Sequence, residues 1–227
     1  MLLAAGRGVR MRPLTDHTPK PLLQVGGKPL IVWHIENLVR AGIGDIVVNH
    51  AHLGKQIEEA LGDGSRLGAH IRYSPEARAL ETAGGIAYAL PLLGEQPFAV
   101  INGDIYCDYD FSRLPASAES MQSNGDGAHL VLVNNPVQHP GGDFGLQRQR
   151  VTDDPPRLTF SGIGIYQPGL FADIARGSIA PLAPLLRRQI TLGKVSGELH
   201  TGLWVDVGTP QRLAELDMQV RTLHNTP

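Results

Sequence analysis

A glycine-rich segment near the N-terminus carries residue types that could bind phosphate. The apolar residues Leu2–Ala5 lead into Gly6-Arg7-Gly8, and Arg10 and Lys20 follow. A strand that ends in small residues and glycines lets backbone N–H groups approach an anion closely. Arg10 and Lys20 would add positive charge, and the prolines on both sides of Lys20 restrict its backbone. We therefore expect this segment to bind a triphosphate.

Two other phosphate-binding motifs do not fit the chain. The dinucleotide motif G-x-G-x-x-G requires a glycine where this sequence has Met11, which argues against an NAD-dependent oxidoreductase. The P-loop motif ends in Gly-Lys-Ser/Thr, but here Gly27-Lys28 is followed by Pro29.

Two aspartates stand where a metal ion could be bound. Asp104 follows the run Phe98–Asn102, whose first four residues are apolar, and Asp206 ends a short strand that contains Trp204. In open α/β sheets, ligands bind at the carboxyl ends of the strands. Magnesium is commonly held by one or two carboxylates together with substrate phosphates and water. Taken alone, each aspartate is more typical of a turn than of a metal ligand.

The elements that must position these residues are visible as alternating patterns. Continuous apolar runs suit strands that are buried on both faces of a sheet. Between them, apolar residues spaced three and four apart predict helices. The expected strands are 46–48, 98–101, 130–133 and 158–166, and the expected helices are 30–39, 56–61, one after Gly84-Gly85, 168–176, 181–192 and one from about Pro210. This order predicts an α/β fold with a Rossmann-like mixed, mainly parallel sheet flanked by helices.

Composition limits the possible functions. The chain has 227 residues and a formal charge of −2, so it lacks the basic surface typical of nucleic-acid binding. The lone Cys107 excludes an intramolecular disulfide and a CxxC metal site. We interpret His50 and His52 as structural or surface residues, because no third ligand has suitable spacing. No apolar run is long enough for a membrane span and no signal pattern is visible, so we expect a cytoplasmic protein.

The N-terminal string closely resembles the signature of the sugar-1-phosphate nucleotidylyltransferases. The string comprises Leu3–Thr15 and Thr18–Leu23, and further landmarks of that family follow in order: Leu80–Gly85, Asn102–Asp104, Asp143–Gly145, Phe160–Gly162 and Trp204–Thr209. The compact length and the segments 80–85 and 195–202 are most similar to the branch that transfers uridylyl groups to N-acetylmuramate 1-phosphate. Members of the family usually carry several residues before Leu-Ala-Ala-Gly, so the first strand is expected to be short.

The resemblance implies a nucleotide-diphospho-sugar transferase fold, Mg²⁺ as cofactor, and an NTP and a sugar 1-phosphate as substrates. It implies that Arg10 holds the departing pyrophosphate, that Lys20 holds the α-phosphate or the sugar phosphate, and that Asp104 and Asp206 bind the metal. The remaining implied nucleotide-binding positions are Ala4, Ala5, Gly6, Gly8, Glu76, Glu81, Thr82 and Asn102. The implied sugar-binding positions are Asp143, Gly145, Gly162 and Glu198. Each acidic residue in these sets is also compatible with a purely structural role.

We expect one domain over residues 1–227, with a nucleotide-binding half at 1–135 and a sugar-binding half at 136–227. Alternative substrates are mannose 1-phosphate with GTP, or glucose 1-phosphate with dTTP or UTP. A non-catalytic sensor of nucleotide sugars is a different class, but it would be free to lose Lys20, Asp104 or Asp206, and this chain has all three. The sequence leaves the oligomeric state open.

Overall fold

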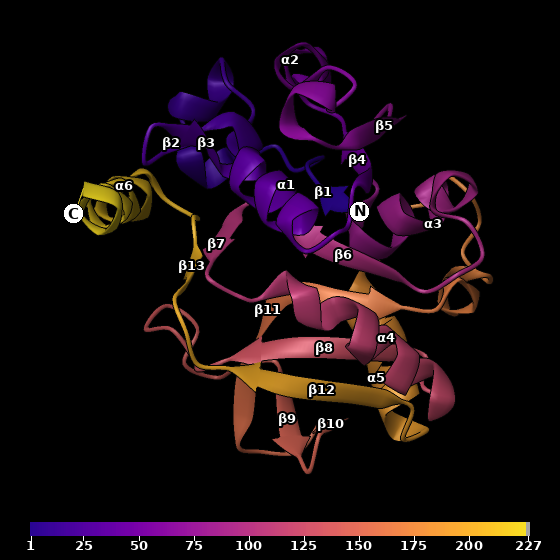
Figure 1. The fold of residues 1–227 in the computed structure, drawn as a ribbon. Helices are drawn as coiled ribbons and strands as arrows, with labels where there is room; N and C mark the ends of the chain where they lie inside the picture. The colour runs from indigo at the N-terminus through magenta and orange to yellow at the C-terminus, as the bar shows by residue number, and fades with distance from the viewer. Residues whose placement is uncertain (226–227) are drawn as a thin grey trace. The chain divides into compact units, whose positions relative to one another are not determined.

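The chain folds into two units, each assembled from segments that are far apart in the sequence (Figure 1). A computed structural model describes residues 1–225. The N-terminal unit comprises Leu2–Ala79, Asn102–Ser112 and the segment from Leu203 onward. The central unit comprises Met1, Leu80–Ile101 and Arg113–Gly202.

The N-terminal unit contains three parallel strands with helices on the connections. The strand order is β5 (His70–Pro75), β4 (Asp45–His50) and β1 (Leu2–Leu3). Helix α1 (Leu30–Arg40) precedes β4, and α2 (Gly54–Leu61) connects β4 to β5. Buried Ile46, Val47 and Val48 form the middle of β4, as their continuous β-branched run predicts. Because the strands run parallel, the residues that follow β1 and β4 lie at the same edge.

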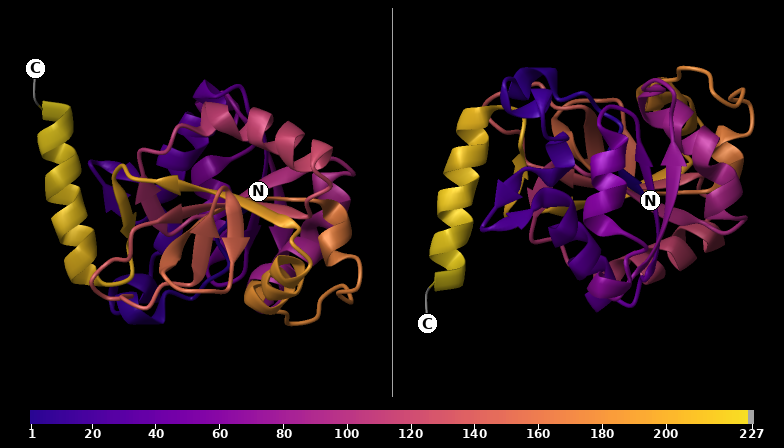
Figure 2. Two further views of the ribbon diagram at one scale, coloured as in Figure 1. Left: turned by 90° about the horizontal axis from the view of Figure 1, so that it is seen from below. Right: turned by 90° about the horizontal axis from the view of Figure 1, so that it is seen from above.

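Two small antiparallel pairs complete this unit. Strand β7 (Ile105–Cys107) pairs with β13 (Trp204–Asp206), and β2 (Gln24–Val25) pairs with β3 (Lys28–Pro29). Helix α6 (Pro210–Asn225) lies alongside the β2–β3 hairpin (Figure 2). Its residues Leu216 and Val220 join the apolar cluster around Val25 and Leu30, so burial of this face holds the C-terminal helix in place.

The central unit contains a mixed sheet. Its strand order is β6 (Phe98–Asn102), β11 (Arg157–Tyr166), β8 (Ala128–Val133), β12 (Val195–His200), β10 (Arg150–Thr152) and β9 (Phe144–Gln147). Strand β12 is parallel to β8, whereas β11 is antiparallel to β6, β8 and β9. Helices α3 (Glu81–Leu93), α4 (Leu114–Ser123) and α5 (Leu182–Thr191) belong to this unit, and α4 packs against β8 (Figure 1). The predicted α/β class with a mixed sheet and flanking helices is confirmed.

Two helices differ from the prediction. The segment expected to be helical at 168–176 forms only a 3₁₀ turn, Pro168–Phe171. Helix α3 begins at Glu81 and includes the two glycines expected to precede it. Gly84 N–H donates to Ala180 O, and a Cβ at Gly84 would lie 2.3 Å from Ser178 O. Glycine is therefore needed there for close packing, and it does not end the helix.

Within residues 1–225, the longest apolar helical stretch falls short of what a membrane span needs.

Candidate active site

The glycine-rich segment after β1 is held in a tight turn. Gly8 has φ +59°, and a Cβ there would lie 2.9 Å from the Thr15 side chain and 3.3 Å from Lys20 Cβ. Buried Thr15 donates from Oγ1 to Gly8 O at 2.8 Å. A Cβ at Gly6, in contrast, would meet no atom within 4 Å. Gly8 is therefore required by the turn itself, whereas the space around exposed Gly6 is open to a ligand.

A buried polar network supports the start of this segment. Ala4 N–H donates to Asn49 Oδ1 at 2.9 Å, and Asn49 Nδ2 donates to Glu76 Oε1 at 2.6 Å. Asn49 and Glu76 are 3% and 6% exposed. The Glu76 carboxylate therefore orients the Asn49 amide that accepts from the backbone N–H of Ala4.

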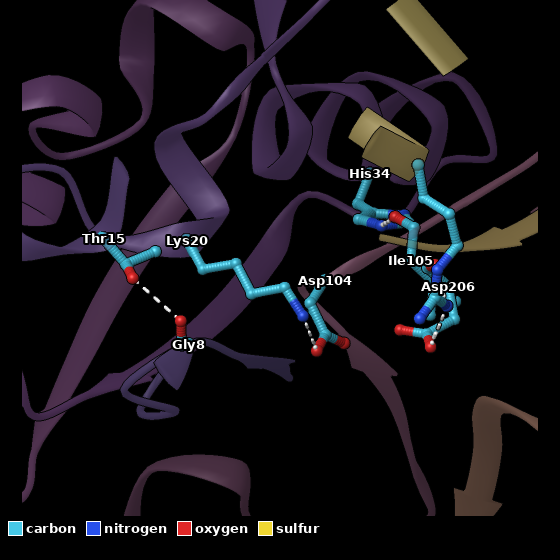
Figure 3. Close-up of polar contacts among 8 residues, drawn as sticks. Gly8, Thr15, Lys20, His34, Asp104, Ile105 and Asp206 are labelled. Atoms are coloured by element: carbon cyan, nitrogen blue, oxygen red, sulfur yellow. Dashed lines mark hydrogen bonds and ion pairs between the residues drawn. The ribbon is translucent and has the colours of Figure 1, made fainter. Parts of the chain in front are cut away.

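Lys20 is directed to Asp104 by its surroundings. Its side chain is 8% exposed, and its Nζ lies 2.6 Å from Asp104 Oδ2 (Figure 3). Lys20 begins a 3₁₀ turn, Lys20–Leu22, and Pro21 lies inside that turn. The Asp104 carboxylate is 39% exposed. A buried ammonium beside a half-exposed carboxylate places fixed positive charge next to a group that remains open to a ligand.

The pairing of β7 with β13 brings Asp206 beside Asp104. Asp206 and Ile105 are register partners, and Val207 N–H donates to Asp104 O at 3.0 Å. Asp206 Oδ2 accepts from Arg212 Nη1 at 2.7 Å, and the same nitrogen donates to the Asp206 backbone oxygen. Residues about a hundred positions apart are thus neighbours, as the metal-site prediction requires.

A buried histidine of α1 forms a hydrogen bond with the backbone of β7. His34 of α1 is 1% exposed, and its Nε2 lies 2.8 Å from Ile105 O, the residue after Asp104. Burial lowers the pKa of His34 from 6.5 to about 4, against the opposing influence of the Ile105 hydrogen bond and the Asp104 charge. His34 is therefore neutral near pH 7 and donates its Nε2–H to the strand.

The two aspartates have the donor chemistry that magnesium prefers. Each carboxylate uses Oδ2 in an ion pair, and neither Oδ1 makes a hydrogen bond within residues 1–225. The described residues contain no group of three or more His, Cys, Asp or Glu side chains suited to a metal. A metal at Asp104 and Asp206 would therefore complete its coordination with water and substrate oxygens, which suits Mg²⁺.

Arg10 lies in the 3₁₀ turn Val9–Met11 after Gly8 and is exposed. Within residues 1–225 its guanidinium has no ion pair or hydrogen bond. A cation that its own protein leaves unpaired is available to an anionic ligand.

Asn102, at the end of β6, is half-buried and precedes Gly103, whose N–H donates to Leu3 O at 2.9 Å.

The other predicted site residues belong to the central unit. Glu81 is exposed and has φ +62°, a strained conformation for a residue with a side chain, and Thr82 follows it in α3. Asp143 accepts from Phe160 N–H at 2.8 Å and lies 3.1 Å from His139 Nε2, so it links its loop to β11. The local backbone favours glycine at both Gly145 and Gly162. A Cβ at Gly145 would lie 2.3 Å from Asp154 O, and Gly162 has φ +84°. Glu198 forms an ion pair with Arg113.

Sequence reasoning missed the residues that support this site. Asn49, Thr15 and Arg212 act through hydrogen bonds that join distant segments. Only Asn49 had a usable signal, since it is a polar residue at the end of a β-branched strand.

Comparisons with known proteins identify the family of the chain. Residues 1–222 match the nucleotidyl transferase family. The chain is 57% identical over 224 residues to the N-acetylmuramate alpha-1-phosphate uridylyltransferase of Neisseria meningitidis serogroup B, with 95% of each chain covered. It is 32% identical to the mannose-1-phosphate guanyltransferase of Aspergillus fumigatus, over 93% of this chain and 61% of that one. A Bacillus anthracis protein solved in complex with sucrose has the same fold, with a TM-score of 0.84, 23% identity, and 97% and 94% of the two chains covered. The chain belongs to the nucleotidyl transferase family, as the resemblance of its motifs implies.

Proposed function

We propose that this protein transfers a uridylyl group from UTP to N-acetylmuramate 1-phosphate. An oxygen of the sugar phosphate attacks the α-phosphorus of UTP, the bond to the bridging oxygen breaks, and pyrophosphate leaves. The product is the UDP-sugar. The observation that carries the proposal is the cluster of Lys20, Asp104 and Asp206 beside the glycine-rich segment, in a chain 57% identical to a uridylyltransferase.

The residues of the site suit the charges of this reaction. Two anions must approach each other, so positioning and positive charge matter more than proton transfer. Lys20 supplies a buried ammonium that is fixed by Asp104, and the unpaired guanidinium of Arg10 is free to hold the leaving pyrophosphate. The open backbone at Gly6 lets phosphate oxygens reach main-chain N–H groups.

Asp104 and Asp206 would hold Mg²⁺ through their free carboxylate oxygens. When bound, the ion would neutralise charge on the phosphates and orient the substrate oxygens. Lys20 would then stabilise the Asp104 carboxylate in the orientation that keeps Oδ1 available.

The choice of uracil and N-acetylmuramate rests on the relatives and on the uridylyltransferase-like segments 80–85 and 195–202. A nucleotide sugar made from N-acetylmuramate 1-phosphate is consistent with recycling of cell-wall sugars in the cytoplasm. Mannose 1-phosphate with GTP is the main competing substrate pair, because a guanyltransferase is among the relatives.

The test of reaction class is pyrophosphate release from a panel of NTPs and sugar 1-phosphates. We expect release only when an NTP, a sugar 1-phosphate and Mg²⁺ are all present. The variant Asp104→Asn should lower turnover by about 10²–10³-fold, the usual effect of removing one transition-state electrostatic contact. The matched control Asp108→Asn removes the same charge from an exposed position four residues away and should retain turnover. Release from an NTP and water alone, with no gain on adding any sugar phosphate, would refute the assignment.

A further inference from the structure

The central unit contains a polar cavity whose lining includes neither Asp104 nor Asp206 nor any residue of the glycine-rich segment. Its volume is about 550 Å³, within the range of small-molecule sites. Its lining residues come from α4, from β8 and β12, and from the β9–β10 hairpin. Its lining includes three arginines, a histidine and several hydroxyl or amide side chains: Arg113, Arg148, Arg150, His129, Ser117, Ser120, Ser196, Asn124 and Gln149.

The hairpin that faces the cavity has an unusual turn. Arg148 and Gln149 alone join β9 to β10, with φ +48° and φ +65°. Two-residue turns of this kind strongly favour Asn-Gly, because left-handed φ values strain larger residues. Gln149 O accepts from Gly197 N–H at 2.9 Å, which ties the turn to β12. The chain therefore keeps two long polar side chains in the lining at a conformational cost.

The arginines are only partly compensated. Arg150 donates from Nη1 to both oxygens of Asp126, each at 2.6 Å, and Asp126 is 2% exposed. Arg113 is paired with Glu198, the carboxylate of the cavity lining. Arg148 has no ion pair or hydrogen bond within residues 1–225. A cavity with excess positive charge thus exists in a chain whose formal charge is −2.

A buried ring nitrogen in the same lining lacks a hydrogen-bond partner. The His129 side chain is 12% exposed, and its Nδ1 lies 3.1 Å from Ser196 Oγ. Its Nε2 makes no hydrogen bond, since the nearest carboxylate oxygen, Glu198 Oε1, is 3.7 Å away. A buried polar atom without a partner carries an energetic cost that a ligand atom could remove.

We propose that this cavity is a second, non-catalytic binding site for a small phosphate-bearing anion. Guanidinium groups suit the geometry of phosphate, and the serine hydroxyls and His129 offer further hydrogen bonds to its oxygens. The volume exceeds that of a bare phosphate, so the ligand is a phosphorylated small molecule or a pyrophosphate-sized anion. The cavity shares no residue with the Lys20–Asp104–Asp206 cluster, and Glu198 is the one residue of its lining that is also an implied sugar-binding position.

The test is a titration of the ¹⁵N-labelled full-length protein with inorganic pyrophosphate in the absence of metal, followed residue by residue by NMR. Backbone amides of Ser196 and Gly197 report on the cavity, whereas those of Gly6 and Gly8 report separately on the glycine-rich segment. We compare the wild type with Arg148→Gly, which removes the guanidinium but is compatible with φ +48°. Arg188→Gln removes the same charge from an exposed position outside the cavity and is the matched control.

We expect saturable shifts at Ser196 and Gly197 in the wild type and in the control. In Arg148→Gly the affinity should fall about tenfold or more, the effect of losing one charge-assisted hydrogen bond. Shifts that fail to saturate, or that weaken equally in Arg188→Gln, would overturn the proposal. If a parallel titration with citrate saturates while the titration with pyrophosphate does not, the proposal is also overturned, because the cavity would then bind carboxylate ligands and not phosphate. Shifts confined to Gly6 and Gly8 would refute the second site while leaving the proposed transferase function intact.

Discussion

Acidification should destabilise the protein through His34. This side chain donates Nε2–H to Ile105 O, and its Nδ1 is buried without a hydrogen-bond partner among residues 1–225. Protonation of Nδ1 would place a charge and an additional N–H donor in an apolar environment beside β7. The folded state therefore disfavours protonated His34, whereas the unfolded chain does not.

The two pKa values set the size and the pH range of the effect. The pKa of His34 falls from 6.5 to about 4 on folding. A base whose pKa is lowered in the folded state costs stability as the pH drops below the unfolded value, and the cost levels off below the folded value. The full cost is about 3 kcal/mol, and about 2 kcal/mol of it is reached between pH 7 and pH 5.

The assay is urea unfolding at pH 7 and pH 5 for the wild type and His34→Gln. A glutamine amide can still donate to Ile105 O, but it does not titrate. The wild type should lose about 2 kcal/mol more between the two pH values than the variant does. As a control, His17→Gln removes an exposed histidine whose side chain makes no ion pair within residues 1–225, and it should lose as much stability between the two pH values as the wild type does. Equal losses in the wild type and His34→Gln would show that His34 does not sense pH in this way.

Three further substitutions or probes test buried contacts within the two units. Gly84→Ala should lower the free energy of unfolding by about 1–3 kcal/mol, because its Cβ would lie 2.3 Å from Ser178 O. Gly169→Ala is the control, since a Cβ there meets no atom within 4 Å and its φ is not positive, and an equal loss in both variants would contradict this reasoning. Asn49→Ala should lower the free energy of unfolding, measured with urea, by about 1–3 kcal/mol, because the hydrogen bonds to Ala4 and Glu76 are lost. A loss no greater than that of Asn124→Ala, at an exposed position, would contradict this prediction. Burial raises the pKa of Cys107 to about 12, so a thiol reagent at pH 8 should modify this residue only after the protein unfolds. Rapid reaction of the native protein would show instead that the thiol is accessible.

The strands and most helices could be predicted because their signals are local. The β-branched run at 46–48 and the apolar spacing of 30–39 determine β4 and α1 almost residue by residue. The 3₁₀ turn at Pro168–Phe171 could not be distinguished from a helix, because Ile174 follows Leu170 and Phe171 at spacings of four and three, as on one face of a helix.

The site was predictable as a set of residue types but not as a set of contacts. The strand-end positions of Asp104 and Asp206 were visible, yet their proximity depends on the pairing of β7 with β13, two three-residue strands with weak patterns. The Lys20–Asp104 ion pair joins residues 84 positions apart, and no local rule predicts it. Likewise, the partnership of Glu198 with Arg113 depends on how α4 packs against the sheet. The assigned roles of the site residues remain predictions.

The most direct test of the central claim is a competition assay analysed by mass spectrometry. Equal concentrations of UTP and GTP, and of N-acetylmuramate 1-phosphate and mannose 1-phosphate, are supplied together with Mg²⁺. Uridylyl transfer to N-acetylmuramate 1-phosphate predicts UDP-N-acetylmuramate as the main product, formed together with pyrophosphate. Accumulation of GDP-mannose as the main product would contradict the substrate assignment and favour the guanylyltransferase alternative.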